Sequence, residues 1–314
     1  MREIAVLGSS EEEKKIFKKY ASAYQVTLRF YENIEQVCKE GRQSLLSISH
    51  AEDMSENNLK RLHQAGVEYI STRSIGLNHI DMAAAKRLDM QVNNVAYSPE
   101  SVAEHTVMLM LMALRNMKNT EKNVEQYDYR LPKKRFRELR ELTVGVVGTG
   151  RIGQTVIGLL RGFGCRIICY DTYQVEGLDY VSYEELLAES DIITYHIPLT
   201  EESLHMLNQD NIRLVKPGAY IVNTARGALI DNEALIAALE SGQLAGAALD
   251  VVENEESFFY KKCKNVGQEL ALLSRMKNVV LTPHSAFYTS QALEDVVENS
   301  IKNCLEYKEE AVYA

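Results

Sequence analysis

The 314-residue sequence contains only five cysteines, and they are not arranged as a metal site or a disulfide framework requires. No two of them form a CxxC pair, and their number is odd. Zinc sites and disulfide-rich folds depend on paired cysteines, so we expect reduced thiols and no bound metal. The cysteines are Cys38, Cys165, Cys169, Cys263 and Cys304.

Long apolar runs are also missing. The first ten residues, MREIAVLGSS, enter a strand-like run without the longer apolar core of a signal peptide. The most apolar helical stretch, VMLMLMAL at 107–114, is too short to span a bilayer. We therefore expect a soluble protein of the cytoplasm that has no membrane partner.

Positive charge is in deficit. Lys and Arg number 35 against 44 for Asp and Glu, the formal net charge is -9, and the pI is about 5.4. This balance argues against nucleic acid or an anionic membrane as the main partner. One basic stretch, PKKRFRELR at 132–140, runs against it, and we interpret that stretch as a solvated helix face or a linker.

Apolar runs of strand length alternate with stretches of helical spacing, clearly from residue 142 onward and more weakly over the first hundred residues. Such alternation indicates parallel sheets covered by helices on both faces. The expected strands are IAVLG, QVTLRFY, SLLSIS, YISTRS and QVNNV in the first part and TVGVVG, RIICYD, DIITYHI, AYIVNTA, LAGAALDV and NVVLTPH in the second.

We therefore predict an α/β protein of two Rossmann-like domains, with doubly wound parallel sheets and a cleft between them. The smaller domain, of the flavodoxin-like type, takes residues 1–98 plus 288–314, because we expect the final helical stretch to return to it. The larger domain takes residues 99–287.

A glycine-rich motif follows the strand TVGVVG. Gly148, Gly150 and Gly153 have the spacing GxGxxG, and Arg151 and Ile152 lie between the last two. The motif opens a predicted helix and precedes Asp171, an acidic residue at the end of the next strand, by about 20 residues. The glycines permit a tight turn, a close approach to a pyrophosphate and helix packing on the strand. Asp171 can accept hydrogen bonds from ribose hydroxyls and would repel a 2′-phosphate, which favours NAD over NADP.

Three chemically active groups fall at or just beyond the ends of later strands. They are Arg226 in NTARG, the acidic residues of DVVENEESFF at 250–259, and His284 in LTPHSAFY. A cation to bind a carboxylate, an acid to protonate a carbonyl oxygen and a carboxylate to keep that acid charged are what reduction of a 2-oxo acid requires. The pattern itself leaves open which of Glu253, Glu255 and Glu256 has that role, or whether all are solvated.

The sequence resembles the D-isomer-specific 2-hydroxyacid dehydrogenases, in the branch of the D-lactate dehydrogenases, over nearly its whole length. Within that branch it is similar to the enzymes of vancomycin-resistance clusters, around YISTRSIG and AAKR. Asp171 departs from those enzymes, which lack an acidic residue there and accept NADPH. The motifs that carry the resemblance are RSIGLNHIDM, NVAYSPESVAEHT, VGVVGTGRIG, VNTARGALID, AALDVVENEESFF and TPHSAFYTSQAL.

The resemblance implies a role for each matched residue. Arg226, Glu255 and His284 match the catalytic residues, which selects one carboxylate from the acidic group. Asp250 matches a contact to the nicotinamide carboxamide. Ile75 and Gly76 match a loop of the smaller, substrate domain whose N–H groups meet the substrate carboxylate. Further cofactor contacts are implied for the glycine motif with Arg151 and Ile152, Ile197, Pro198, Thr224 and Ala225, and further substrate contacts for Tyr97, Arg226 and Phe287.

The leading hypothesis is reversible, NADH-dependent reduction of pyruvate to D-lactate. One alternative is a bulkier 2-oxo acid, such as 2-ketoisocaproate or phenylpyruvate, and another is a non-catalytic NAD sensor similar to corepressors. We also predict a homodimer, because the methionine-rich stretch SVAEHTVMLMLMALRN at 101–116 carries more apolar surface than one domain face buries. In the family this helix pairs with its mate across a two-fold axis.

Overall fold

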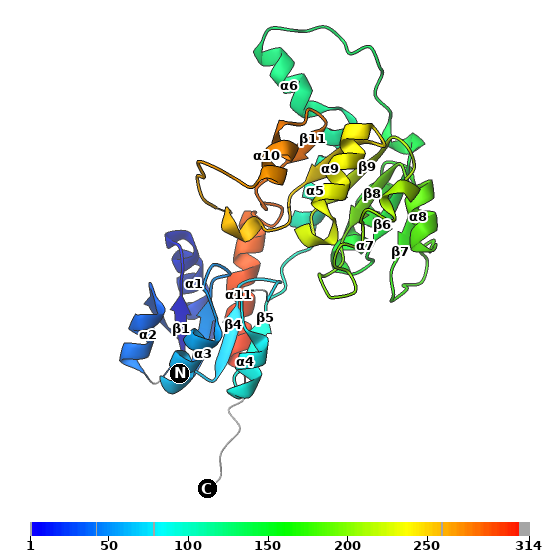
Figure 1. Cartoon of the computed structure of the whole chain (residues 1–314). Coiled ribbons are helices and arrows are strands. Elements are labelled where there is room, and N and C mark those ends of the chain that lie inside the picture. The colour runs from blue at the N-terminus through cyan, green and yellow to red at the C-terminus, as the bar shows by residue number, and fades with distance from the viewer. Residues whose placement is uncertain (1, 42, 78, 259, 308–314) are drawn as a thin grey trace. The chain divides into compact units, whose positions relative to one another are not determined.

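The apolar runs of the sequence form parallel strands in two separate sheets, one in each of two units (Figure 1). The computed structural model describes residues 2–41, 43–77, 79–258 and 260–307. Unit 1 comprises the described residues of Met1–Ser98 and Tyr288–Ala314, and unit 2 is Pro99–Phe287. The prediction of two parallel-sheet α/β domains is confirmed.

Unit 1 has a five-stranded sheet in the order β2-β1-β3-β4-β5, which is the order of flavodoxin-like sheets. Helices α1 and α11 cover one face, and α2, α3 and α4 cover the other. The strands are β1 (Glu3–Leu7), β2 (Thr27–Tyr31), β3 (Leu45–Ile48), β4 (Tyr69–Thr72) and β5 (Gln91–Asn94). The helices are α1 (Glu11–Tyr24), α2 (Ile34–Glu40), α3 (Glu56–Gln64), α4 (Met82–Arg87) and α11 (Ser290–Glu306).

Unit 2 has a six-stranded sheet in the order β11-β10-β9-β8-β6-β7. Its strands are β6 (Thr143–Val147), β7 (Arg166–Tyr170), β8 (Ile192–Tyr195), β9 (Ala219–Asn223), β10 (Leu244–Leu249) and β11 (Val279–Leu281). Its α-helices are α5 (Glu100–Leu114), α6 (Met117–Glu125), α7 (Arg151–Arg161), α8 (Tyr183–Glu189), α9 (Asn232–Ser241) and α10 (Gln268–Arg275). Short 3-10 turns are η1 (Leu139–Glu141), η2 (Ile212–Leu214), η3 (Gly227–Leu229) and η4 (Glu255–Ser257).

Two apolar cores hold the sheet of unit 2 between its helices. Helices α5 and α7 pack on one face, and α8, α9 and α10 pack on the other. Every residue of β8 is buried, as a strand covered on both faces must be. The basic stretch 132–140 lies in an exposed segment between α6 and β6 that is not helical before residue 139, so it is a linker and not a helix face.

Candidate functional site

The predicted site residues of unit 2 gather at the carboxyl edge of its sheet. All strands of this sheet run parallel, so the loops that follow them emerge at one edge. The chain passes from β6 to β7 on one side and continues with β8 on the other side of β6. Such a switch point is where open α/β sheets bind ligands.

The glycine motif lies at this switch point, between β6 and α7. Gly148 has φ +97°, and a Cβ there would lie 2.7 Å from the carbonyl of His196 and from the side chain of Ile197. A Cβ on Gly153 would lie 1.9 Å from the carbonyl oxygen of Gly148. A Cβ on Gly150 would meet nothing within 4 Å, so this glycine borders open space at the start of α7. The motif thus has a tight turn at Gly148, a closely packed helix start at Gly153 and an open backbone at Gly150. This arrangement fits a pyrophosphate.

Asp171 follows β7 and faces the same motif. Its Oδ2 accepts the backbone N–H of Thr149 at 2.6 Å and the Thr149 hydroxyl at 3.1 Å, and its Oδ1 accepts the N–H of Tyr173 at 2.9 Å. Burial alone would raise the pKa of this carboxyl, but these hydrogen bonds outweigh it and lower the pKa below the usual value. Asp171 is therefore an ionised acceptor, only partly buried, beside the glycine motif. These features fit the adenosine ribose of NAD.

Other predicted cofactor residues lie at the same edge. Thr224 follows β9, and its hydroxyl pairs with that of Thr106 on α5 at 2.8 Å. Among the rest, Ile197 touches the glycine turn, whereas Pro198 and Arg151 are exposed. Ile152 is half-buried and packs against the α5–α7 core, and Ala225 is buried.

Glu255 and His284 form a hydrogen-bonded pair. The Nδ1 of His284 lies 3.0 Å from Oε1 of Glu255, and Oε2 of Glu255 accepts the N–H of Val252 at 2.9 Å. Glu255 is only 7% exposed, so its charge acts at short range with little screening. A carboxylate can only accept, so Nδ1 carries the hydrogen of this pair. That leaves Nε2 as the nitrogen that can give a proton to a ligand.

His284 has a left-handed backbone conformation, with φ +50°. Such a conformation is unusual for a non-glycine residue and persists only where its surroundings enforce it. Asp250, at the end of β10, supplies the constraint. Its carbonyl oxygen accepts the N–H of His284 at 2.8 Å, and its carboxylate accepts the N–H groups of Ser285 and Ala286, each at 2.9 Å.

The Asp250 carboxylate has two further partners. The hydroxyl of Thr282 donates to Oδ1 at 2.5 Å, and Nε2 of His105 on α5 lies 3.4 Å from the same oxygen. Burial would raise the pKa of Asp250, but the hydrogen bonds from His105, Thr282, Ser285 and Ala286 lower it to about 2. Asp250 therefore remains ionised and holds the residues that flank His284.

Arg226 follows β9, the strand next to β10. It is partly exposed, and its Nη1 donates to the carbonyl of Ala225 at 2.6 Å. The next residue, Gly227, explains how two loops meet here. A Cβ on Gly227 would lie 2.0 Å from the carbonyl carbon of Val252, so only glycine lets the segment that carries Glu255 pass beside Arg226.

Glu253 is not a simply solvated charge, because its Oε1 lies 2.9 Å from Nε2 of His205. Its side chain is 25% exposed, and that of His205 is 38% exposed. Two carboxylates of the acidic stretch therefore each pair with a histidine from another segment. They are Glu253 and Glu255, which lie on either side of Asn254. The side chain of Glu256 lies outside the described residues.

Besides Arg226, the predicted substrate residues comprise three in unit 1 and one in unit 2. Ile75 and Gly76 lie in the loop after β4, where Ile75 is 37% exposed. Tyr97 is half-buried against the core that α1 and α11 share. In unit 2, the ring of Phe287 packs edge-on against His284, with ring centroids 5.9 Å apart. The substrate roles of these four residues remain predictions.

Sequence reasoning missed Gly227, His105, His205 and Thr282. The motif NTARG contains Gly227, but only the close approach of Val252 shows why a glycine stands there. His105 lies in the motif NVAYSPESVAEHT, and Thr282 lies two residues before His284. Their contact, 3.2 Å between His105 Nε2 and Thr282 Oγ1, joins elements far apart in the sequence.

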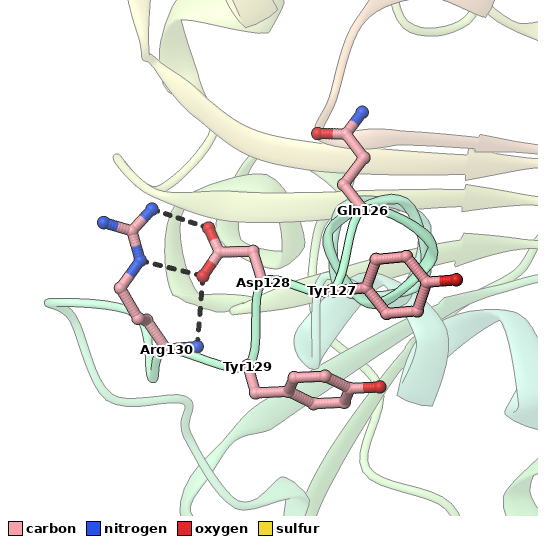
Figure 2. Close-up of a pocket in the computed structure, with 5 residues that line it drawn as sticks. All are labelled: Gln126, Tyr127, Asp128, Tyr129 and Arg130. Carbon is pink, nitrogen blue, oxygen red and sulfur yellow. Dashed lines mark hydrogen bonds and ion pairs between the residues drawn. The ribbon is translucent and has the colours of Figure 1, made fainter.

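A surface pocket elsewhere in unit 2 contains none of the predicted site residues. It is lined by five consecutive residues, Gln126, Tyr127, Asp128, Tyr129 and Arg130. Figure 2 shows the two tyrosine rings on one side of this segment and the Arg130–Asp128 ion pair on the other. Among the described residues, no three His, Cys, Asp or Glu side chains are grouped to hold a metal ion, and no helix could cross a membrane.

Comparison with known proteins agrees with this geometry. The family model of the D-isomer specific 2-hydroxyacid dehydrogenases, NAD binding domain, matches residues 107–286. A D-specific alpha-keto acid dehydrogenase of Enterococcus faecium is 50% identical over 266 residues, 84% of this chain and 83% of that protein. An aromatic 2-oxoacid reductase of Clostridium sporogenes is 42% identical over 272 residues, 84% and 82% of the two chains.

A solved structure extends the likeness to the whole fold. The crystal structure of a D-lactate dehydrogenase from Treponema pallidum superposes with a TM-score of 0.87 at 33% identity, over 96% of each chain. The matched family model covers the glycine motif, Asp171 and the carboxyl edge of the unit 2 sheet, where the fit to NAD was found. This chain therefore belongs to the D-isomer-specific 2-hydroxyacid dehydrogenases, in the D-lactate dehydrogenase branch, and is an NAD-binding oxidoreductase.

Proposed function

We propose that the chain reduces pyruvate to D-lactate with NADH, and that the reaction is reversible. The observation that carries the proposal is the Glu255–His284 pair at the cofactor-binding edge of unit 2. A buried carboxylate that holds Nδ1 of a partly exposed imidazole is an arrangement for proton transfer through Nε2.

Each catalytic side chain has a distinct task in this proposal. Arg226 holds the substrate carboxylate, because its planar guanidinium can give two parallel hydrogen bonds. His284 gives a proton from Nε2 to the carbonyl oxygen of the substrate as that oxygen gains negative charge. Glu255 keeps the ring oriented and stabilises the imidazolium. Bound NADH supplies the hydride that the keto carbon accepts.

The remaining site residues bind and orient. We propose that the N–H groups of Ile75 and Gly76 meet the substrate carboxylate, and that Tyr97 and Phe287 limit the size of the substrate side chain. Asp250 holds the segment around His284, and we keep its contact to the nicotinamide carboxamide as part of the proposal. In the reverse direction, the neutral imidazole of His284 accepts the hydroxyl proton of a D-2-hydroxy acid.

A substrate panel tests the proposal. The specificity constants for pyruvate, 2-ketoisocaproate and phenylpyruvate are measured with NADH, and the hand of each product is determined. We expect pyruvate to give the largest value and a D-product. A larger value for phenylpyruvate would assign the chain to bulkier 2-oxo acids, as in its aromatic 2-oxoacid reductase relative. Binding of NADH without reduction of any of these acids would favour the alternative of a non-catalytic NAD sensor.

Arg226→Lys tests the role of the guanidinium. Lysine keeps the charge but cannot hold a carboxylate with two parallel hydrogen bonds. We expect a large fall in the specificity constant for pyruvate and little change in NADH affinity. If NADH affinity alone fell, Arg226 would bind the cofactor, and its assigned role would be wrong.

A further inference from the structure

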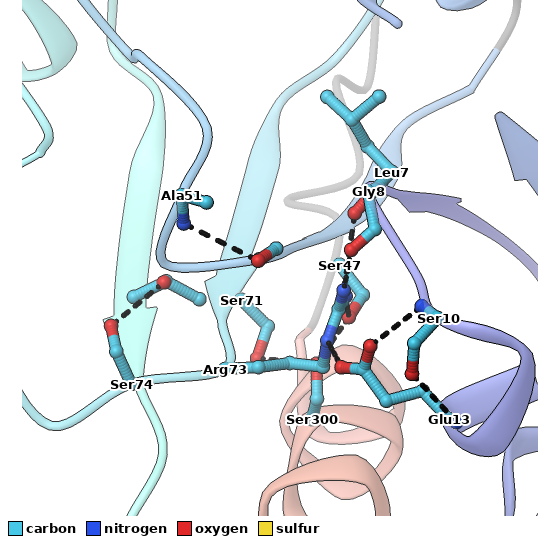
Figure 3. Close-up of polar contacts among 12 residues, drawn as sticks. Leu7, Gly8, Ser10, Glu13, Ser47, Ala51, Ser71, Arg73, Ser74 and Ser300 are labelled. Atoms are coloured by element: carbon cyan, nitrogen blue, oxygen red, sulfur yellow. Dashed lines mark hydrogen bonds and ion pairs between the residues drawn. The ribbon is translucent and has the colours of Figure 1, made fainter. Parts of the chain in front are cut away.

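Arg73 has a buried guanidinium, which makes four hydrogen bonds, just after β4 in unit 1. Its side chain is 1% exposed. Nε donates to Glu13 Oε1 at 2.9 Å, and Nη1 donates to the hydroxyl of Ser47 at 2.9 Å. Nη2 donates to the carbonyl oxygens of Leu7 at 3.1 Å and Gly8 at 2.7 Å (Figure 3).

These contacts join elements that are far apart in the sequence. Glu13 belongs to the first turn of α1, where its Oε2 accepts the N–H of Ser10. Leu7 ends β1 and Gly8 follows it, and the N–H of Arg73 donates to the carbonyl of Ile48 at the end of β3. The guanidinium thus fixes the end of β4 against the ends of β1 and β3 and against the start of α1.

A chain of hydroxyls extends the cluster to the last helix. The hydroxyl of Ser47 pairs with that of Ser300 on α11 at 2.7 Å, and Ser300 donates to Ser71 on β4 at 3.0 Å (Figure 3). Arg73 therefore holds β4 both directly and through a layer of buried hydroxyl groups. We call Arg73, Glu13, Ser47, Ser71 and Ser300 the arginine cluster.

The residues after Arg73 form the loop that contains Ile75 and Gly76, and its carbonyl groups are all occupied. The carbonyl of Ser74 accepts Val95 N–H at 3.2 Å, that of Ile75 accepts Asn94 Nδ2 at 2.7 Å, and that of Gly76 accepts the Ser74 hydroxyl at 2.7 Å. In the described part of the chain, the N–H groups of Ile75 and Gly76 meet no acceptor. The loop can therefore still donate hydrogen bonds from these N–H groups, which suits the binding of an anionic carboxylate.

We propose that Arg73 is a positioning residue, which fixes the loop 74–76 so that its N–H groups meet the substrate carboxylate. This inference rests on the proposed function, because it deepens the role given there to Ile75 and Gly76. A buried ion pair is often no more stabilising than an apolar replacement, so stability alone does not explain one. What an apolar residue cannot do is bind Glu13, Ser47 and two carbonyl oxygens at once.

The test uses full-length variants at a temperature where each is folded by circular dichroism. Arg73→Lys keeps the charge but loses the planar guanidinium with its several donors. Arg73→Met removes both the charge and the donors, and Glu13→Gln removes the charge of the partner. Val37→Ala is the matched control, because Val37 is a buried residue of α2 whose truncation destabilises unit 1 without touching the arginine cluster. For each variant, the KM for pyruvate, kcat and the Kd for NADH are measured.

We expect both Arg73 variants to raise the KM for pyruvate, on the order of tenfold to a hundredfold, because a small displacement of a binding group has a large kinetic effect. Glu13→Gln should move the KM in the same direction by less. The Kd for NADH should not change, because the cofactor residues belong to unit 2. Val37→Ala should lower the melting temperature and leave KM as it is.

Hydrogen exchange gives a readout that does not depend on turnover. The backbone amides of Arg73 and Val95 donate to Ile48 and to the loop residue Ser74, so they report on the anchoring of the loop. Both should exchange faster in Arg73→Lys than in Val37→Ala. An unchanged KM, or an unchanged exchange rate at these amides, would overturn the role of Arg73. If the unaltered protein reduced no 2-oxo acid, the proposed function would fail, and exchange would still decide whether Arg73 holds the loop.

Discussion

Asp171 is the residue on which we expect cofactor choice to depend. Its ionised carboxylate lies beside the glycine motif, held by the N–H and hydroxyl of Thr149. Asp171→Ser removes the charge that opposes a 2′-phosphate, so the ratio of specificity constants for NADH and NADPH should shift toward NADPH. Asp171→Asn is the matched variant, because it removes the charge and keeps an acceptor for Thr149. An unchanged NADH preference in both variants would contradict the assignment.

Glu255 and Glu253 each pair with a histidine, but only Glu255 pairs with His284. Glu255→Gln keeps an acceptor for Nδ1 and loses the charge that stabilises the imidazolium. We expect kcat for pyruvate reduction to fall, within the factor of about 10²–10⁴ that general acid catalysis contributes. Glu253→Gln should have a much smaller effect, because its partner is His205. A larger loss in Glu253→Gln than in Glu255→Gln would show that the wrong carboxylate had been selected.

At the scale of the element, the segment that follows β11 depends on Asp250 for its conformation. The pKa of Asp250 is about 2 in the folded protein, below that of a free aspartate, so its ionised form stabilises the fold. This contribution, roughly 2 kcal/mol, is present above about pH 4 and is lost as the pH falls toward about 2.

Asp250→Asn removes this titration. The difference in urea midpoint between the unaltered protein and Asp250→Asn should therefore be large at neutral pH and shrink as the pH is lowered from about 4 to about 2. Circular dichroism follows the unfolding. A difference that stayed constant over this range would mean that the Asp250 carboxylate does not stabilise the folded chain through its charge.

The elements of the fold could be predicted because their sequence signals are local. Each expected strand run overlaps one observed strand, from IAVLG with β1 to NVVLTPH with β11. The glycine motif was recognisable for the same reason, since strand, turn and helix follow one another within about fifteen residues. The detailed bonding around His284 was not predictable. Its left-handed φ depends on Asp250, which lies 34 residues earlier and supplies both its carbonyl and its carboxylate.

The choice of Glu255 came from family resemblance, because three glutamates within four residues have no local signal that separates them. The structure brings Glu255 to His284 and Glu253 to His205 because Asn254, with φ +62°, turns the backbone between them. The role of Gly227 was hidden for a similar reason. Gly227 is required by the close approach of Val252, which lies 25 residues later, and no local sequence pattern indicates that approach.

At the scale of the whole molecule, we expect a homodimer. On α5, Met108 is 41% and Leu111 is 36% exposed, although the opposite face of the helix is buried. The segment after α5 also exposes apolar side chains, which are Val124, Tyr127, Tyr129, Leu131 and Phe136. Exposed apolar side chains of this kind are typical of an interaction site.

Light scattering at micromolar concentration should give a mass near twice 35.5 kDa. Changing Met108 and Leu111 together to Lys should reduce the mass to that of one chain and leave the circular dichroism spectrum unaltered, since both side chains are already exposed. A single-chain mass for the unaltered protein would refute the dimer.

Helix α5 reaches the carboxyl edge of unit 2 through two neighbouring side chains, His105 to Thr282 and Thr106 to Thr224. In the homodimer that we expect, the same helix also faces the second subunit. Association and ligand binding at this edge are then thermodynamically linked, because contacts that stabilise α5 in the dimer also stabilise the strand ends that α5 contacts. Specific activity should accordingly depend on enzyme concentration, and it should fall when the enzyme is diluted below the dissociation constant of the dimer.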